Sequence, residues 1–242
     1  MLETAENRSL YDYLWPVVAT VMVTTAIAAI FLLAPTEETM GTAQRIVYIH
    51  VSVAWMGLAA FVFMAVTGGM YLFRRDLAWD HWSQAALEIG WLCCSLTLAT
   101  GSLWAHAAWN TWWTWDPRLT TAFVLWAMYS AAMVLRSGVE DPHRRARMGA
   151  IVAIVGMLDV PLVVMATRWF RGIHPKSPHM EPSMRVVLVI SVVCFTVFFT
   201  MLLLLRRSQL RVAEALENLE CGDLSPLSAE LCEAFPISKR LA

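Results

Sequence analysis

Six long apolar stretches occupy most of this chain and restrict it to a membrane. A helix needs roughly 20 apolar residues to cross the hydrocarbon layer of about 30 Å. The stretches that meet or approach this length are Pro16–Ala34, Ile46–Phe73, Ser83–Ala105, Leu119–Leu135, Gly149–Ala166 and Arg185–Leu205. Charged residues make up only 15 % of the 242 residues and hydrophobic residues 58 %, so the chain cannot cover itself with polar surface in water. The sequence therefore predicts an all-α fold, a polytopic membrane bundle of six transmembrane helices.

The lysines and arginines between the stretches predict how the chain is oriented. If the N-terminus lies inside, the inner segments hold twelve of the 18 basic residues and the outer segments hold six. Because basic residues collect on the cytoplasmic side, we expect both termini in the cytoplasm. The chain then divides into a six-span membrane domain over residues 1–205 and a cytoplasmic tail over residues 206–242. Within the tail, Arg211–Leu219 is expected to form a short amphipathic helix.

The charge balance and the cysteines exclude several classes of function. The net charge is −1, from 18 basic and 19 acidic residues, which argues against a nucleic-acid partner. The five cysteines show no C-x-x-C spacing, so a disulfide framework, a zinc site and covalent c-type haem attachment all lack support. The sequence contains no G-x-x-x-x-G-K-[ST] loop, so we expect no ATP chemistry in this chain.

The segment between the third and fourth stretches is unusually rich in tryptophan. Five of the twelve tryptophans fall between residues 104 and 115. Tryptophan favours the headgroup level of a membrane, but anchoring at one loop does not require five indoles. We interpret four of them as a rigid apolar platform for a large, flat aromatic ligand. These four are Trp109, Trp112, Trp113 and Trp115.

The residues that follow the tryptophans predict the start of the fourth helix. Asp116 suits the N-cap position, and Pro117 suits the first helical position. Arg118 comes directly after them. We therefore expect Asp116 to cap the helix, and a second role in holding the loop is compatible with capping.

Residues 109–120 resemble the WWD signature, W-G-x-W-W-x-W-D, of the haem-handling proteins of cytochrome c maturation. Here they read W-N-T-W-W-T-W-D-P-R-L-T. Six spans in 242 residues resemble the short CcmC family and not the much larger CcmF, and the resemblance covers about residues 10–205. The sequence departs from the family at Asn110, where glycine is usual, and at His106. Glycine reaches backbone conformations that asparagine does not always reach, so Asn110 could change the conformation of the loop.

The resemblance implies a protein that binds haem and passes it to another protein. Such proteins bind haem b without a covalent bond, at the periplasmic face of the bacterial inner membrane. They deliver it to the periplasmic haem chaperone CcmE, as part of a complex with CcmD, the ATPase CcmA and the permease CcmB. The resemblance thus implies that this chain positions haem within an ABC-type transporter complex, with no catalysis of its own and with its WWD loop in the periplasm.

His50 is the one histidine that we expect inside a membrane span. It lies four residues past the outer start of the second stretch, about 6 Å below the membrane surface at 1.5 Å per residue. An imidazole at that depth needs a partner, and the small residues Ala54 and Gly57 leave space beside it. A hydrogen bond to a neighbouring helix is the alternative to a role in ligand binding.

His174 follows the fifth stretch on the same outer side as His50. A lone loop histidine would be solvated, but two histidines beside a tryptophan platform suit haem, whose iron accepts two axial imidazoles. The resemblance implies that His50 and His174 are these iron ligands. His179 in the same loop competes for the second position, and His106 is a weaker competitor.

Arginines at the outer edge of the membrane suit the two propionates of haem. Arg45 precedes His50, Arg118 follows the platform, and Arg171 flanks His174. Outer arginines run against the positive-inside bias, and the arginine side chain pairs with carboxylates in a bidentate manner. Contact with lipid headgroups or helix capping is the alternative for each of them.

The sequence gives weaker support to two other classes of function. A membrane cytochrome b for electron transfer would need histidine pairs that face each other within helices, and only His50 is predicted inside a span. A transporter would need a polar path, but apart from His50 and Asp159 the spans hold few polar groups. Asp159 lies two residues before Pro161, where we expect a kink, and we interpret it as a structural carboxylate.

Overall fold

The computed structural model describes residues 10–170, 172, 174 and 180–222 of the chain. Within these residues no strand occurs, and six helical segments are long and apolar enough to cross a membrane. The predicted all-α, six-span bundle is therefore confirmed. The six spans are Leu14–Leu33, Thr42–Arg74, Leu77–Trp109, Pro117–Ser137, Pro142–Ala166 and Pro182–Leu216.

The ends of the observed helices differ from those of the apolar stretches, and the fifth stretch is divided between two helices. They are α1 (Leu10–Ala28), α2 (Arg45–Arg74), α3 (Leu77–Trp109), α4 (Pro117–Ser137), α5 (Pro142–Gly156), α6 (Asp159–Trp169) and α7 (Pro182–Gly222). A π-helical turn over Ala29–Leu33 continues α1, and a 3-10 turn over Thr42–Gln44 precedes α2.

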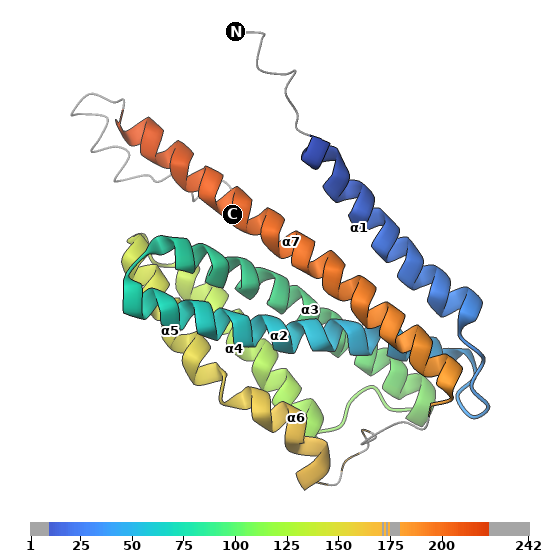
Figure 1. Ribbon diagram of the computed structural model, residues 1–242. Helices are drawn as coiled ribbons and strands as arrows, with labels where there is room; N and C mark the ends of the chain where they lie inside the picture. The colour runs from blue at the N-terminus through green and yellow to red at the C-terminus, as the bar shows by residue number, and fades with distance from the viewer. Residues whose placement is uncertain (1–9, 171, 173, 175–179, 223–242) are drawn as a thin grey trace.

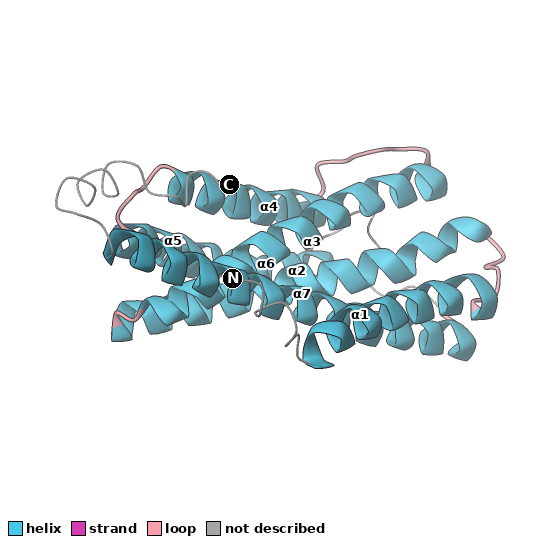
Figure 2. Cartoon of the chain, turned by 90° about the horizontal axis from the view of Figure 1, so that it is seen from above, coloured by secondary structure: helices cyan, strands magenta, loops and turns pink. Residues whose placement is uncertain are grey.

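α2 and α3 form a long antiparallel hairpin around which the other helices are arranged. Arg75 takes the left-handed backbone conformation (φ 56°) between them, and its N–H donates to the Tyr71 carbonyl at 2.8 Å. Asp76 caps α3 by accepting a hydrogen bond from the Ala78 N–H. α7 packs along the hairpin, and α1 lies on the far side of α7 (Figure 1). α4, α5 and α6 pack together on the opposite side of the hairpin (Figure 2).

The fifth span is broken between α5 and α6, close to the predicted kink. Met157 and Leu158 form a turn in which both N–H groups still donate to carbonyls of α5, at 3.0 and 3.2 Å. α6 begins directly after this turn, at Asp159. Pro161 therefore lies in the first turn of α6, where a proline does not disrupt helical hydrogen bonds because the first N–H groups have no intrahelical partner. The break makes α6 a short, separate helix that leads to His174.

A tyrosine on α4 fixes the spacing of the central helices. Tyr129 is fully buried, and its hydroxyl donates to the Gly57 carbonyl of α2 at 2.8 Å. Its ring packs edge-on against Phe61, with 4.7 Å between centroids. A Cβ at Gly90 of α3 would lie 2.1 Å from the Tyr129 hydroxyl oxygen, so only glycine leaves room for this contact. Tyr129 therefore holds α2, α3 and α4 together in the interior of the bundle.

Charged side chains join the helices at the end opposite the tryptophan segment. Arg136 of α4 donates two hydrogen bonds to Asp80 of α3, at 2.7 and 2.8 Å, and a third to Gln84 at 3.0 Å. Arg206 of α7 pairs with Glu88 of α3. α7 continues through residue 206 to Gly222, so the helix predicted over Arg211–Leu219 is part of α7. The domain boundary at residue 205 stays a prediction.

Candidate functional site

A cavity lies at the end of the bundle that carries the tryptophan segment. It encloses about 800 Å³ of empty space, part of which is open to solvent. Its lining runs along α3 from Trp109 down to Cys94, about 22 Å at 1.5 Å per residue. The deep part is apolar, with walls from α2, α3, α4 and α6. The apolar and small residues that line it include Ala54, Gly57, Leu58, Leu98, Leu125 and Val163.

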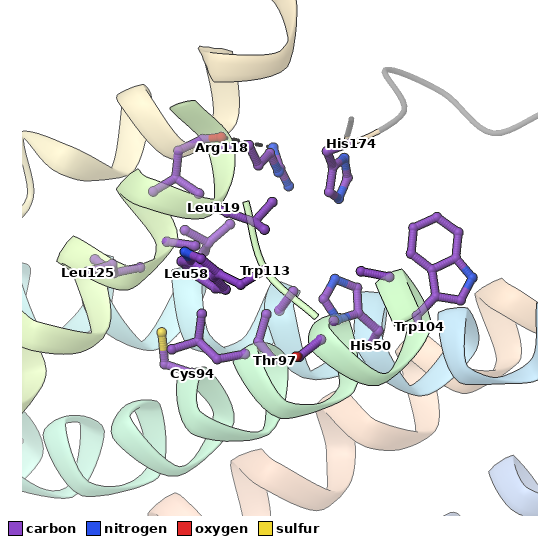
Figure 3. A pocket seen from close by; sticks show the side chains of 18 of the residues that line it. His50, Leu58, Cys94, Thr97, Trp104, Trp113, Arg118, Leu119, Leu125 and His174 are labelled. Atoms are coloured by element: carbon purple, nitrogen blue, oxygen red, sulfur yellow. Dashed lines mark hydrogen bonds between the residues drawn. The ribbon is translucent and has the colours of Figure 1, made fainter. Parts of the chain in front are cut away.

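Both predicted iron ligands line this cavity. His50 reaches it from α2, and His174 reaches it from the connection between α6 and α7 (Figure 3). The two residues are 124 positions apart in the sequence, yet they project into the same space. His50 also makes the hydrogen bond to a neighbouring helix that was its alternative interpretation, from its Nδ1 to the Thr100 hydroxyl at 3.1 Å. The two interpretations are compatible because an imidazole has a second nitrogen.

The structure separates the four platform tryptophans into two pairs. Trp109 and Trp113 line the cavity. Trp112 instead stacks on His106, with 4.0 Å between ring centroids and 7° between the planes. Trp115 is 72 % exposed and touches Trp113 edge-on. Among the described residues, neither Trp112 nor Trp115 belongs to the cavity lining.

A fifth indole, which sequence reasoning did not assign to the site, also lines the cavity. Trp104 is buried on α3 and packs edge-on against Trp109 at 4.7 Å. The only feature of the sequence that could have indicated this role is that Trp104 belongs to the tryptophan-rich segment between residues 104 and 115. In Figure 3 it lies on the opposite side of His50 from Trp113. Trp104, Trp109 and Trp113 therefore all line the cavity that His50 enters.

The departure from the family at Asn110 is accommodated by the backbone. Asn110 ends α3 in the left-handed conformation (φ 54°), which asparagine adopts more readily than most residues. Its N–H donates to the His106 carbonyl at 2.9 Å. The Ser102 hydroxyl donates to the Trp112 carbonyl at 2.7 Å and ties the loop back to α3. The loop therefore turns sharply at Asn110 without glycine.

Asp116 caps α4 and also touches the connection that carries His174. Its Oδ1 accepts the Leu119 N–H at 2.8 Å, and Pro117 occupies the first turn, so the predicted helix start is confirmed. A Cβ added to Gly172 would lie 2.9 Å from Asp116 Oδ2. The tryptophan segment and the His174 connection therefore meet at this carboxylate.

The predicted arginines have different surroundings. Arg118 lines the cavity, and one of its nitrogens donates to the Val163 carbonyl of α6 at 2.8 Å. Arg45 instead lies over the ring of Phe31, 5.4 Å from its centroid, and among the described residues it is not part of the lining. Arg171 and the competing His179 lie outside the described residues.

Comparison with known proteins identifies the family to which this architecture belongs. The model of the family described as Heme exporter protein C (CcmC) matches residues 4–220. The chain belongs to this family. A Heme exporter protein C from Rhodobacter capsulatus is 32 % identical over 218 residues, which cover 85 % of this chain and 89 % of the relative. One from Bradyrhizobium diazoefficiens is 33 % identical over 178 residues, which cover 70 % of this chain and 67 % of the relative.

A mitochondrial relative extends the similarity beyond bacteria. The putative cytochrome c biosynthesis ccmC-like mitochondrial protein of Marchantia polymorpha is 30 % identical over 144 residues, which cover 60 % of each chain. Membership of the Heme exporter protein C family agrees with the resemblance drawn from residues 109–120.

The donors around the cavity suit a flat ligand that carries a metal and carboxylates. Two imidazoles provide nitrogen ligands, and the Trp109 and Trp113 rings provide apolar faces. The Trp113 indole N–H is buried and has no hydrogen-bond partner among the described residues. Such a donor favours a ligand that brings its own acceptor.

Proposed function

We propose that this chain binds haem b non-covalently in the cavity, with iron between His50 and His174, and delivers it to the chaperone CcmE during cytochrome c maturation. The observation that carries the proposal is that His50 and His174 reach one cavity from different elements, beside Trp113 and Arg118. The name of the relatives, Heme exporter protein C, agrees with haem as the cargo.

The shape and polarity of the cavity support haem as the cargo. The cavity is lined mainly by apolar and aromatic side chains together with a few polar groups, which is typical of small-molecule sites. The apolar floor suits the porphyrin, and Arg118 keeps N–H donors beyond the one used by Val163 that a propionate can accept. Two axial imidazoles hold the iron, and the open side of the cavity leaves a porphyrin edge within reach of the chaperone.

Delivery can be measured directly. We expect the purified chain to contain haem and, when incubated with haem-free CcmE in a membrane preparation, to lose haem as CcmE gains it. The measurement is haem bound to each separated protein over time. An electron-carrying cytochrome b would instead be reduced and reoxidised repeatedly while its haem content stays constant, and that result would contradict the proposal.

The proposed setting is the bacterial inner membrane, with the haem site on the periplasmic side. The bias of basic residues supports both termini in the cytoplasm. The proposed partners besides CcmE are CcmD, the ATPase CcmA and the permease CcmB, which supply the ATP chemistry for which this sequence has no P-loop. The outer arginines outside the lining, including Arg45, are proposed to face headgroups or propionates.

A reporter experiment tests this orientation. A periplasm-active enzyme fused after His174 should be active, and the same enzyme fused at Arg145 should be inactive, because the two positions lie at opposite ends of the fifth span. A cytoplasm-active reporter at the same positions should give the reverse pattern. Finding the two sides exchanged would place the cavity in the cytoplasm and remove the route to CcmE.

The two pairs of tryptophans should differ in their effect on haem. Trp113→Ala removes an indole from the cavity wall. Because the lost stacking is worth about 0.5–1.5 kcal/mol, we expect the haem dissociation constant to rise about 2- to 10-fold. Trp115→Ala removes a largely exposed ring and should have the smaller effect. The measurement is the haem dissociation constant of each purified variant.

Trp15 provides the control, because its side chain is half exposed on α1 and, among the described residues, it is not part of the cavity lining. Trp15→Ala should leave haem affinity unchanged. Equal haem affinity for Trp113→Ala, Trp15→Ala and wild type would show that the tryptophan segment only anchors the chain at the membrane surface.

A further inference from the structure

Two successive residues of α3 contact the imidazole of His50. The Thr100 hydroxyl oxygen lies 3.1 Å from Nδ1. A Cβ placed on the next residue, Gly101, would lie 2.8 Å from Cε1 and 3.3 Å from Nδ1 of the same ring. The ring therefore lies directly against the α3 backbone at Gly101, with its Nδ1 edge at Thr100.

The hydrogen bonds of Thr100 indicate which nitrogen of His50 carries the proton. The Thr100 hydroxyl donates to the Leu96 carbonyl at 2.6 Å, one helical turn earlier. A hydroxyl has one hydrogen, so with this hydrogen on Leu96 the oxygen can only accept from His50. Nδ1 must then carry the ring hydrogen, because it is the donor in the 3.1 Å contact. In a neutral imidazole this leaves Nε2 unprotonated.

The unprotonated nitrogen is the one that a metal needs. Imidazole binds iron through a nitrogen lone pair, and a hydrogen bond from the other ring nitrogen fixes the tautomer and the ring orientation. His50 lines the cavity, so its Nε2 is the nitrogen available to a ligand there. Gly101 contributes by space, since any side chain at this position would push the ring away from α3.

We infer that Thr100 and Gly101 are positioning residues for His50: Thr100 holds Nδ1–H so that Nε2 is free to bind haem iron, and Gly101 lets the ring lie against α3. Neither residue touches the iron in this inference. The inference rests on the proposed function, because it takes His50 as an iron ligand.

The hydroxyl of Thr100 is tested with two variants that differ only in hydrogen bonding. Thr100→Val keeps the shape and removes the acceptor, so haem should be released about 10-fold faster, the lower end of the range for partners of metal ligands. The midpoint potential of the haem should shift to a more positive value, because a less basic imidazole stabilises ferric iron less. Thr100→Ser keeps a hydroxyl and should restore both properties.

The space at Gly101 is tested separately. Gly101→Ala should displace the imidazole and raise the fraction of five-coordinate, high-spin haem in the absorbance and electron paramagnetic resonance spectra, even with Thr100 present. Thr121→Val is the matched control, because the Thr121 hydroxyl also donates to a carbonyl one turn earlier and among the described residues Thr121 is not part of the lining. It should behave as wild type.

The outcomes separate this inference from the proposed function. If His50→Gly loses six-coordinate haem while Thr100→Val keeps the wild-type potential and release rate, the inference is wrong and the function stands. If His50→Gly keeps six-coordinate haem, the ligand assignment fails and the inference fails with it. If Thr100→Val is too unstable to purify, Gly101→Ala still decides: a wild-type spin state in this variant overturns the inference.

Discussion

His50→Gly and His174→Gly will each lose the six-coordinate low-spin spectrum of haem. Each variant removes one of the two imidazoles that reach the cavity, and low-spin haem requires both axial positions to be filled by strong ligands. Bound haem per folded molecule should fall by more than about 10-fold, because losing a metal ligand costs more than losing its hydrogen-bond partner, which already costs 10–100-fold. The measurement is the absorbance spectrum of the detergent-purified protein with its haem-to-protein ratio.

Free imidazole provides the control for a folding defect. Glycine leaves a space of the size of the lost ring, so added imidazole should restore part of the low-spin spectrum in both variants. A variant that is merely misfolded would not respond. His179→Gly should keep the wild-type spectrum, and loss of low-spin haem in that variant but not in His174→Gly would assign the second ligand to His179.

The largest effect on stability is expected at the buried ion pair between α3 and α4. Asp80 is 3 % exposed and Arg136 is 6 % exposed, and a Cβ at Gly149 of α5 would collide with the guanidinium. Arg136→Met leaves the Asp80 carboxylate buried without its partner, so we expect a loss of about 3–5 kcal/mol in the free energy of unfolding. The measurement is unfolding of the detergent-solubilised protein by increasing concentrations of sodium dodecyl sulfate.

Two further variants make this prediction specific. Arg136→Met combined with Asp80→Leu removes both charges and should recover most of the lost stability, because apolar replacements of a buried ion pair are often neutral. Arg206→Gln breaks the more exposed pair with Glu88, whose side chains are 36 % and 26 % exposed, and should cost no more than about 1 kcal/mol. Equal losses for Arg136→Met and Arg206→Gln would contradict the role of burial.

The spans and the helix start at Asp116 were predictable because the signals are local. Apolar length alone identifies membrane helices, and an Asp-Pro pair specifies a cap and a first turn within three residues. The broken fifth span was partly predictable, since Pro161 indicated a kink. Its exact place, at Met157 and Leu158, depends on where the chain can satisfy backbone hydrogen bonds within the bundle.

The contacts within the site were less predictable because they join residues far apart in the sequence. Trp113 lines the cavity, whereas Trp112 and Trp115 do not, and this difference depends on where side chains point in an irregular segment. Such a segment has no helical or strand periodicity from which side-chain directions can be predicted. The contact of Thr100 and Gly101 with His50 depends on how α2 and α3 align, and nothing in either helix alone indicates it. Arg45 near His50 in the sequence suggested a site residue, but its guanidinium lies over Phe31.

The closeness of Gly172 to Asp116 has a consequence for how the two histidines are held. Asp116 caps the first turn of α4 through one oxygen, and its other oxygen would lie 2.9 Å from a Cβ at Gly172. A larger residue at position 172 would therefore have to displace either the cap or the chain that leads to His174. The His50 side is held within the long hairpin of α2 and α3. The two histidines are therefore held in different ways: His50 belongs to a long helical hairpin, whereas His174 follows a short connection that lies beside the capping carboxylate of α4.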